Sequence, residues 1–418
     1  MIINKKVIIS SVLGNILEFY DLMLFGIFAP IISPLFFYSN HKSLSLLMGY
    51  LAFAISFIFR PLGALYFGQI ADKFGRKKSL TSSILLMACA TGMIGLIPTY
   101  AQIGIIAPLL VTFFRCVQGF SAGGEYNSSA IYLLEYMNKS RNISVSFLTA
   151  SGVVGTLLAT LFFSISLNPS IPDWFWRVPF LSGSILGIVG LYIRSKLPES
   201  PEFNNILKQN KILKNPLKEV LKSDKEKLLI SFFIGSFNGI IYYFQFVYLT
   251  TYFNNYLGIE LKYATNFNTI GLLFYMVFLV LNGFLADLIG TKKIMSFACW
   301  GFIFLTIPIF YVFSFEKITY IIICEIVLSY MNASFCGLKH VFLADLFSAN
   351  KRCIGVSLGY SLGLAIFGGS TPFIMTLLDK KIGGWFSSYY IMSFAVFSIL
   401  AITRSKASEN ITKNIAVV

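Results

Sequence analysis

Apolar segments long enough to cross a lipid bilayer follow one another along almost the whole chain, and they limit the possible folds more than any other feature. A transmembrane helix needs about 20 apolar residues, and the 418 residues are 56% hydrophobic and only 12% charged. Because irregular backbone cannot face lipid, such segments must be helices. The sequence therefore predicts an all-α polytopic membrane protein and not a soluble protein with a single anchor.

Twelve transmembrane helices account for the apolar segments. In chain order we place them at 8–37, 44–71, 79–98, 104–136, 143–167, 177–196, 227–256, 262–286, 294–313, 318–347, 353–378 and 384–403. The one long polar connection, 197–226, contains three prolines and Lys/Glu pairs, which predict short amphipathic helices on the membrane surface. We therefore expect a six-helix bundle over 1–196, a cytoplasmic linker over 197–226, and a second six-helix bundle with a short cytoplasmic tail over 227–418.

The distribution of Lys and Arg predicts the orientation of these helices. The connections that we assign to the cytoplasm contain most of them: Lys5, Lys6, Lys73, Arg76, Lys77, Lys78, Lys139, Arg141, the lysines of 194–227, Lys292, Lys293, Lys351, Arg352, Arg404, Lys406 and Lys413. The opposite side contains only Lys42, Lys262, Lys317, Lys380 and Lys381, with Arg177 at the boundary. By the positive-inside rule both termini lie in the cytoplasm, so the net charge of +15 reflects orientation and not nucleic-acid binding.

A charged loop occurs twice, once in each half of the chain. The segment 68–78 reads GQIADKFGRKK, and 283–293, which begins 215 positions later, reads GFLADLIGTKK. Six of the eleven positions are identical: Gly68/Gly283, Ala71/Ala286, Asp72/Asp287, Gly75/Gly290, Lys77/Lys292 and Lys78/Lys293. A repeat at this spacing predicts two structurally related halves.

Each residue type in the first loop has a physical use. Gly68 lets another helix approach closely, and Asp72 can meet the free N–H groups of a neighbouring helix or a cation. Gly75 allows a positive φ in the turn, and Arg76 begins a basic cluster that faces the anionic leaflet. We predict that Gly68, Asp72, Gly75, Arg76, Asp287 and Gly290 form conformational latches. The second loop has Thr291 where the first has Arg76, so we expect it to be the weaker latch.

Charged residues inside apolar helices are costly, and each is therefore a candidate for function. Asn15, Glu18 and Asp21 are three residues apart on the first helix and share one face. We predict that the two acids, together with Glu125 of the fourth helix, couple transport to protons. The alternative is a structural polar stripe tied to neighbouring helices.

Further polar residues in the spans are candidates to bind a solute. Arg60 lies deep in the second helix and is either a substrate contact or a counter-ion of the first-helix acids. Arg115 and Gln118 share a face of the fourth helix, where an arginine fork suits a carboxylate; the alternative is a structural Arg115–Glu125 lock. Asn15 and Tyr20 complete the predicted site, with Lys339 as a second anion contact or a salt partner of Glu125.

Other classes of protein lack support in the residues. The six cysteines have no CxxC spacing and there are only two histidines, so we expect no metal and no cofactor. No nucleophile–base set or phosphate loop indicates an enzyme. The first apolar segment carries two acids and is too long for a cleaved signal peptide. We expect a monomer that lies in a lipid bilayer.

Several motifs together give a resemblance to a known family. The repeated loop resembles the signature loop of the major facilitator superfamily. Within this superfamily, the chain resembles the metabolite:proton symporter family over nearly its whole length. That family includes proline/betaine, α-ketoglutarate, citrate and shikimate transporters. The motifs that carry the resemblance are Gly14-Asn15…Glu18-Phe19-Tyr20-Asp21, Arg60-Pro61-Leu62-Gly63, the segment 118–126 (QGFSAGGEY), 176–180 (WRVPF), 198–201 (PESP) and 355–369.

The resemblance implies proton-driven uptake of a small carboxylate-bearing solute, such as proline/betaine or a di- or tricarboxylate, by alternating access. It also implies that the protein lies in the cell inner (plasma) membrane and that its partners there are a small organic solute and a proton. An exchanger or exporter of the same fold is the first alternative, although 151–156 (SGVVGT) lacks the Gly-Pro pattern typical of antiporters. A transporter-like osmosensor is the second. The short tail has no heptad repeat and argues against it, because the osmosensing relatives often carry a C-terminal coiled coil.

Overall fold

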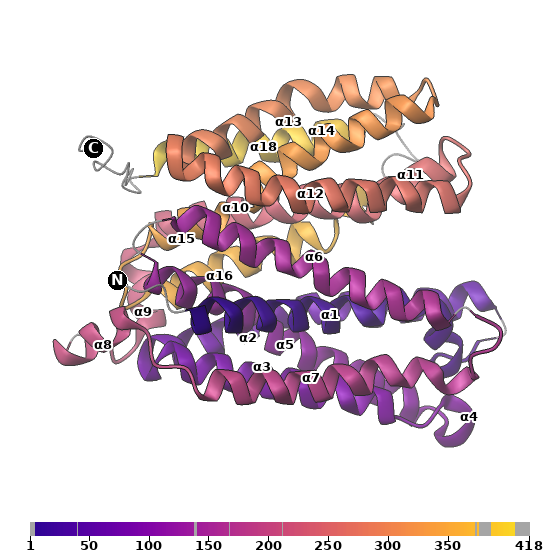
Figure 1. The fold of residues 1–418 in the computed structure, drawn as a ribbon, viewed down its shortest axis with the longest axis horizontal. Coiled ribbons are helices and arrows are strands. Elements are labelled where there is room, and N and C mark those ends of the chain that lie inside the picture. The colour runs from indigo at the N-terminus through magenta and orange to yellow at the C-terminus, as the bar shows by residue number, and fades with distance from the viewer. Residues whose placement is uncertain are drawn as a thin grey trace. The chain divides into compact units, whose positions relative to one another are not determined.

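The computed structural model describes residues 5–39, 41–137, 140–166, 168–210, 212–372, 374–375 and 386–405 (Figure 1). The first half of the chain is helical throughout its long apolar segments, as their composition predicts. Its helices are α1 (Lys5–Phe36), α2 (Lys42–Phe74), α3 (Arg76–Leu96), α4 (Tyr100–Ile103), α5 (Ile106–Tyr136), α6 (Arg141–Ser166), the 3₁₀ turn η1 (Asp173–Trp176) and α7 (Arg177–Ser195).

The polar connection contains two short helices, as predicted: α8 (Pro201–Lys208) and α9 (Pro216–Ser223). The second half continues with α10 (Lys225–Tyr243), the π-helical turn η2 (Phe244–Tyr248), α11 (Leu249–Asn255), α12 (Leu261–Ile289), α13 (Thr291–Phe313), α14 (Ile318–Cys336), α15 (Lys339–Ala344), α16 (Arg352–Gly363), the π-helical turn η3 (Leu364–Gly368) and α18 (Phe386–Arg404). Parts of the predicted helices 353–378 and 384–403, and the predicted tail, lie outside the described residues.

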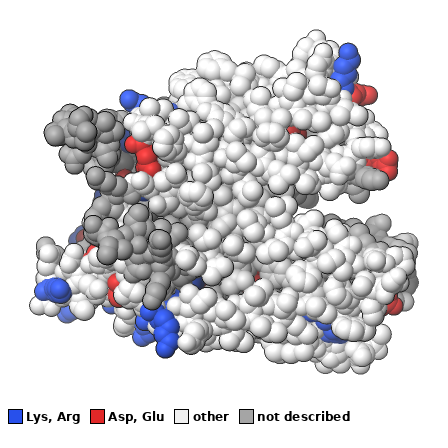
Figure 2. All heavy atoms as spheres, viewed as in Figure 1, with Lys and Arg blue, Asp and Glu red and all other residues white. Residues whose placement is uncertain are grey.

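Eleven helices among the described residues are long and apolar enough to cross a membrane. The stretch Arg352–Gly368 is an additional, shorter apolar helix. On the face shown in Figure 2, each unit is uncharged over most of its area, and the Lys, Arg, Asp and Glu side chains lie near the helix ends. A polar surface would be costly in hydrocarbon, so this pattern fits helices that face lipid. The predicted all-α membrane fold is confirmed.

The chain forms two compact units by its internal contacts. Unit 1 consists of 1–136, 151–218 and 349–358, and unit 2 of 137–150, 219–348 and 359–418. Each unit therefore includes a short segment from the other half of the sequence: the start of α16 lies in unit 1, and the start of α6 in unit 2. The six-helix division at 1–196 and 227–418 stays a prediction.

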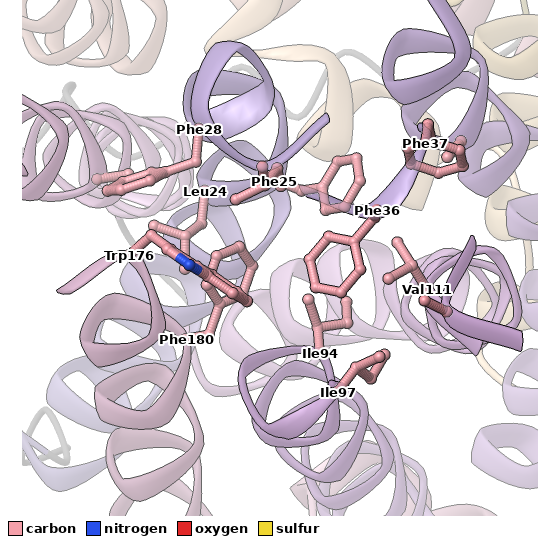
Figure 3. Packing of buried hydrophobic residues seen from close by; sticks show 14 of the residues in the cluster. Leu24, Phe25, Phe28, Phe36, Phe37, Ile94, Ile97, Val111, Trp176 and Phe180 are labelled. Atoms are coloured by element: carbon pink, nitrogen blue, oxygen red, sulfur yellow. The ribbon is translucent and has the colours of Figure 1, made fainter. Parts of the chain in front are cut away.

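An apolar core of unit 1 gathers around α1 (Figure 3). Leu24, Phe25, Phe28 and Phe36 are fully buried there, and Phe36 meets the Trp176 ring edge-on at a centroid distance of 5.4 Å. The other labelled members come from α3, α5 and α7 or lie at the helix ends: Phe37, Ile94, Ile97, Val111 and Phe180. This packing fixes α1, which carries the predicted acids, against its neighbours.

Glycines bring α2 and α5 close enough for backbone contact. A Cβ at Gly119 would overlap the carbonyl of Ser56, and one at Gly123 would overlap the carbonyl of Arg60. Small residues at such crossings are typical of membrane helices. The close approach determines how deeply the polar side chains of α5 are buried.

Candidate functional site: a buried charge network and two helix caps

Three polar side chains of α1 lie buried, as their spacing predicts. Asn15, Glu18 and Asp21 are 0%, 6% and 2% exposed, and Asn15 Nδ2 donates to Ser151 Oγ at 3.0 Å. Glu18 Oε2 and Asp21 Oδ1 have no hydrogen-bond partner among the described residues. A buried carboxylate that is incompletely paired is costly. Both acids are therefore suited to bind and release a proton.

A chain of hydrogen bonds connects Asp21 with Arg115 of α5. Asp21 shares a hydrogen bond with the Thr91 hydroxyl of α3. Thr91 Oγ1 accepts from Gln118 Nε2 at 2.7 Å, and Gln118 Oε1 accepts from Arg115 Nη1 at 2.7 Å. Because Gln118 donates to the Thr91 hydroxyl, the hydroxyl proton is available to Asp21. A change in the charge or position of one end can thus reach the other end.

Arg115 is fully buried, and the structure corrects one prediction about it. Its Nη2 donates to Ser56 Oγ at 3.1 Å, and its guanidinium carbon lies 4.7 Å from the Phe25 ring centroid and 5.2 Å from that of Phe53. Its Nε has no hydrogen-bond partner in the described part of the chain. The alternative of an Arg115–Glu125 lock is wrong, since Arg115 bonds to neutral side chains. A guanidinium held in this way can still receive a carboxylate.

Glu125 is paired with a different cation, Arg194 of α7. Arg194 Nη1 forms a salt bridge with Glu125 Oε1, and the Ser83 hydroxyl donates to Glu125 Oε2. The side chains of the pair are 3% and 4% exposed. The Glu18 carboxyl group is close enough to interact electrostatically with both Glu125 and Arg194. The pair therefore ties α5 to α7 and also neighbours one of the predicted proton sites.

Two predicted substrate residues of unit 1 have other surroundings. Arg60 forms no salt bridge with either acid of α1, and its guanidinium carbon lies 4.4 Å from the Phe57 ring centroid. Its Nε and Nη2 have no hydrogen-bond partner among the described residues, and its charge interacts with Glu18 without a direct salt bridge. The Tyr20 hydroxyl donates to the carbonyl of Pro179 at 2.8 Å, and the ring belongs to the apolar core. These contacts favour a packing role for Tyr20.

Lys339, the predicted anion contact of the second half, lies in unit 2 at the start of α15. It is 2% exposed, and its Nζ donates to the carbonyl of Cys336 at 2.7 Å. The predicted salt bridge with Glu125 is replaced by the one from Arg194.

The first repeated loop caps a helix. Asp72, at the end of α2, accepts from the backbone N–H groups of Cys353 at 3.3 Å and Ile354 at 2.9 Å, in the first turn of α16. A carboxylate is favourable there because a helix begins with free N–H groups and a partial positive charge. Gly68 lies against Ile354, and Gly75 has φ 105°, the positive value predicted for the turn.

Arg76 joins this cap to two further segments. Its Nε and Nη2 bind the Glu135 carboxylate at 3.0 Å, its Nη2 also donates to the Ala349 carbonyl at 2.6 Å, and its Nη1 lies 3.4 Å from Asp72 Oδ1. Arg352 completes the cluster at 3.2 Å from Glu135 Oε1. With Arg76 and Glu135 at 0% side-chain exposure, this is a buried, fully paired network.

Glu199, from the connection after α7, caps the next helix. Its carboxylate accepts from the backbone N–H groups of Arg76 at 3.0 Å and Lys77 at 3.2 Å, at the start of α3. Burial raises the pKa of Glu199, and the backbone donors act in the opposite direction. Glu135 and Glu199 are not among the predicted site residues, although 198–201 is one of the motifs of the family resemblance.

The second repeated loop has the same geometry in unit 2. Asp287 accepts from the backbone N–H groups of Asn142 at 3.0 Å and Ile143 at 3.1 Å, in the first turn of α6. Gly290 has φ 105°, as Gly75 does. The Thr291 hydroxyl, in the place of the Arg76 guanidinium, donates to Asn142 Oδ1 at 2.9 Å and has no salt bridge within the described residues. The repeat therefore encodes two helix caps, of which the first has the larger ionic network.

A buried acid of unit 2, Glu325 of α14, is also absent from the predicted site residues. It is 0% exposed, and Gln245 of η2 donates to its Oε2 at 3.0 Å. Its Oε1 has no hydrogen-bond partner within the described ranges. An acid inside a predicted span was the available signal. Arg194 was missed for another reason, since it lies next to the polar connection, where basic residues are common.

The fold and these sites together define a polytopic transport protein: charges buried among membrane-spanning helices and carboxylates that cap helix starts at repeated loops. Residues 13–323 match the family described as Major Facilitator Superfamily. The chain belongs to the major facilitator superfamily, and it is a transporter and not an enzyme.

Curated relatives and solved structures agree. A candidate proline/betaine transporter of Staphylococcus aureus (strain COL) is 31% identical over 408 residues, which are 96% of this chain and 87% of the relative. The proline/betaine transporter of Salmonella typhimurium is 28% identical, with 97% and 84% covered. The structure of the proton:xylose symporter XylE matches with a TM-score of 0.76 at 18% identity and 94% coverage of both chains. This likeness confirms the predicted twelve-helix fold.

Proposed function

We propose that the protein imports a small carboxylate-bearing solute, such as proline or betaine, together with a proton. The observation that carries the proposal is the hydrogen-bond path from Asp21 through Thr91 and Gln118 to Arg115. It links an acid that can hold a proton to a cation that can hold a carboxylate. A symporter needs such a link because its proton and solute sites must respond to each other.

The chemistry of the site supports a zwitterionic or anionic solute. Arg115 offers a planar set of donors and lies between aromatic rings. When a solute carboxylate binds it, the amide of Gln118 loses one of its competing partners and can turn. The Thr91 hydroxyl and Asp21 then receive a different set of hydrogen bonds, which changes the affinity of Asp21 for its proton. Glu18, beside the Glu125–Arg194 pair, is the second member of the proton-binding pair.

Arg115→Lys tests the solute contact. An ammonium is a point charge that cannot replace the guanidinium fork, so we expect solute affinity to fall at least about tenfold, the equivalent of about 1.4 kcal/mol. The loss should be the same in pH-driven uptake and in exchange of labelled for unlabelled solute, since both require binding. Titration of labelled proline or betaine into reconstituted protein measures it. Unchanged affinity in both modes would remove Arg115 from the site.

The two helix caps support alternating access, in which the two halves of the chain rock about a central site. Asp72 lies on α2 and caps a helix of the second half, whereas Asp287 lies on α12 and caps a helix of the first half. Such contacts have to open and close in each cycle. We propose that they are latches, with Gly68, Gly75, Arg76 and Gly290 setting their geometry.

Asp72→Asn is therefore expected to slow turnover about tenfold or more while solute affinity stays nearly constant. The charge that holds Arg76 and the α16 backbone is lost. Asp287→Asn is the matched variant, and we expect a smaller effect because no arginine belongs to that cap. The rate of solute exchange at saturating solute, with the dissociation constant measured alongside, gives the comparison. Equal and negligible effects would show that the loops only set topology.

We further propose that the protein lies in the cell inner (plasma) membrane with both termini in the cytoplasm. The Lys/Arg asymmetry supports this orientation. A cysteine placed at Asn210, in a variant without the six native cysteines, should react with a membrane-impermeant maleimide only after the cells are opened. A cysteine at Asn168, on the predicted outer side, should react in intact cells. The reverse pattern would overturn the topology.

A further inference from the structure

A continuous groove runs along α13 and α18 in unit 2 and begins at the two lysines that end the second repeated loop. One part has a volume of about 570 Å³ and is lined by Lys292, Lys293, Ser296, Phe297, Trp300, Ile402 and Thr403. A second part of about 400 Å³ shares Ser296, Trp300 and Thr403 and extends to Ile303, Val396, Ile399 and Leu400. The shared lining residues make the two parts one groove.

The groove is amphiphilic along its length. Both cations of its lining are in the first turn of α13, and no acid is among the residues that line it. From Lys292 to Ile303 the helix rises ~16 Å at 1.5 Å per residue, close to the ~15 Å depth of one leaflet of a bilayer. Phe297 and Trp300 are 56% and 49% exposed along this path. A charged end and an apolar wall of leaflet depth match the shape of a phospholipid.

At the charged end of the groove, Lys292 connects α13 to α18. Its Nζ donates to the carbonyl of Ser405 at 2.9 Å, which brings the end of α18 to the start of α13. An ammonium has three donors, so one hydrogen bond leaves capacity for a phosphate. Arg404, in the last turn of α18, adds an exposed cation at the same end.

The first repeat supplies a comparison. There the N–H groups of Arg76 and Lys77 at the start of α3 are occupied by the Glu199 carboxylate. At the start of α13, Gly290 provides no side-chain cap, and the backbone N–H groups of Thr291 and Lys292 have no acceptor among the described residues. The helix start at the Lys-Lys pair of the first repeat therefore binds a carboxylate of the protein, and the equivalent helix start of the second repeat binds none among the described residues.

We propose that this groove binds an anionic phospholipid of the cytoplasmic leaflet. The phosphate lies at Lys292 and Lys293, and an acyl chain follows Trp300 and Leu400. Basic pockets between membrane helices on the cytoplasmic side are suited to anionic lipid head groups. The inference depends on the proposed orientation of the chain but not on the solute or the coupling ion.

The test compares two matched double variants by native mass spectrometry of the purified protein with phosphatidylglycerol or phosphatidylcholine. Lys292→Gln/Lys293→Gln removes the lysines of the groove, and Lys77→Gln/Lys78→Gln removes their counterparts in the first repeat. We expect phosphatidylglycerol to bind roughly twentyfold more weakly to the first variant and unchanged to the second. Equal losses would indicate attraction to surface charge in general, and no loss in either variant would equally overturn the proposal.

A second measurement uses protein with intact lysines, so it does not depend on how those variants fold. Phosphatidylglycerol with brominated acyl chains should quench Trp300 more than brominated phosphatidylcholine does, and the difference between wild type and Trp300→Phe isolates this signal. Inorganic phosphate at equal concentration should not relieve the quenching. Equal quenching by both lipids, or relief by phosphate alone, would contradict a phospholipid site. Neither assay requires transport, so failure of the proposed function leaves the result interpretable.

Discussion

Arg194→Gln is expected to lower the free energy of unfolding by about 3–5 kcal/mol, because it leaves Glu125 buried without its counter-ion. The two side chains are 3% and 4% exposed, so water cannot replace the lost partner. A glutamine can still donate one hydrogen bond, but it carries no charge. Denaturant or thermal unfolding of the purified protein in detergent measures the loss.

Two variants serve as controls for this prediction. The double variant Arg194→Gln/Glu125→Gln removes both charges and should recover part of the stability. Arg141→Gln breaks the salt bridge with Asp345, whose side chains are 22% and 18% exposed, and should cost at most about 1 kcal/mol. If Arg194→Gln costs no more than Arg141→Gln, the pair is not the structural tie that its burial indicates.

The membrane-spanning helices could be located because hydropathy and segment length are local properties, whereas the orientation drawn from the Lys/Arg asymmetry stays a prediction. The predicted helix 79–98 is α3, which begins three residues earlier and ends two residues earlier, and 318–347 becomes α14 and α15 with a break at Gly337 and Leu338. The π-helical turns could not be foreseen, because they depend on what packs beside them. The positive φ of Gly75 and Gly290 followed directly from the repeat.

The partners of the buried charges could not be predicted in the same way. Spacing along α5 indicated that Arg115 and Gln118 share a face, and they are bonded. It could not show that Glu125 turns to Arg194, which is 69 positions away and next to a basic linker. Pairing across helices depends on the packing of α3, α5 and α7, and a single sequence carries no direct signal of it.

Asp21→Asn is expected to abolish accumulation of solute against its gradient when a pH gradient is the only driving force. An asparagine keeps the size of the side chain and can still bond to the Thr91 hydroxyl. It cannot gain or lose the proton that we propose is transported. Exchange of labelled for unlabelled solute across the membrane needs no net movement of protons, so it should continue at about the wild-type rate.

The control is Asn15→Ala on the same face of α1, which removes a polar group that does not titrate. It should lower activity in both modes together, through stability or solute affinity, without separating them. Glu18→Gln is the companion variant, since Glu18 is the second acid of the pair. Loss of pH-driven accumulation in Glu18→Gln alone would move the transported proton from Asp21 to Glu18.

The most direct measurement places purified wild type, Asp21→Asn and Glu18→Gln in proteoliposomes, and follows labelled proline or betaine with and without an imposed inward proton gradient. We expect gradient-driven accumulation in wild type, and exchange without accumulation in Asp21→Asn. Accumulation at the wild-type level in both variants would contradict the proposed coupling, because the acids of α1 would then be structural and the driving ion would have to bind elsewhere.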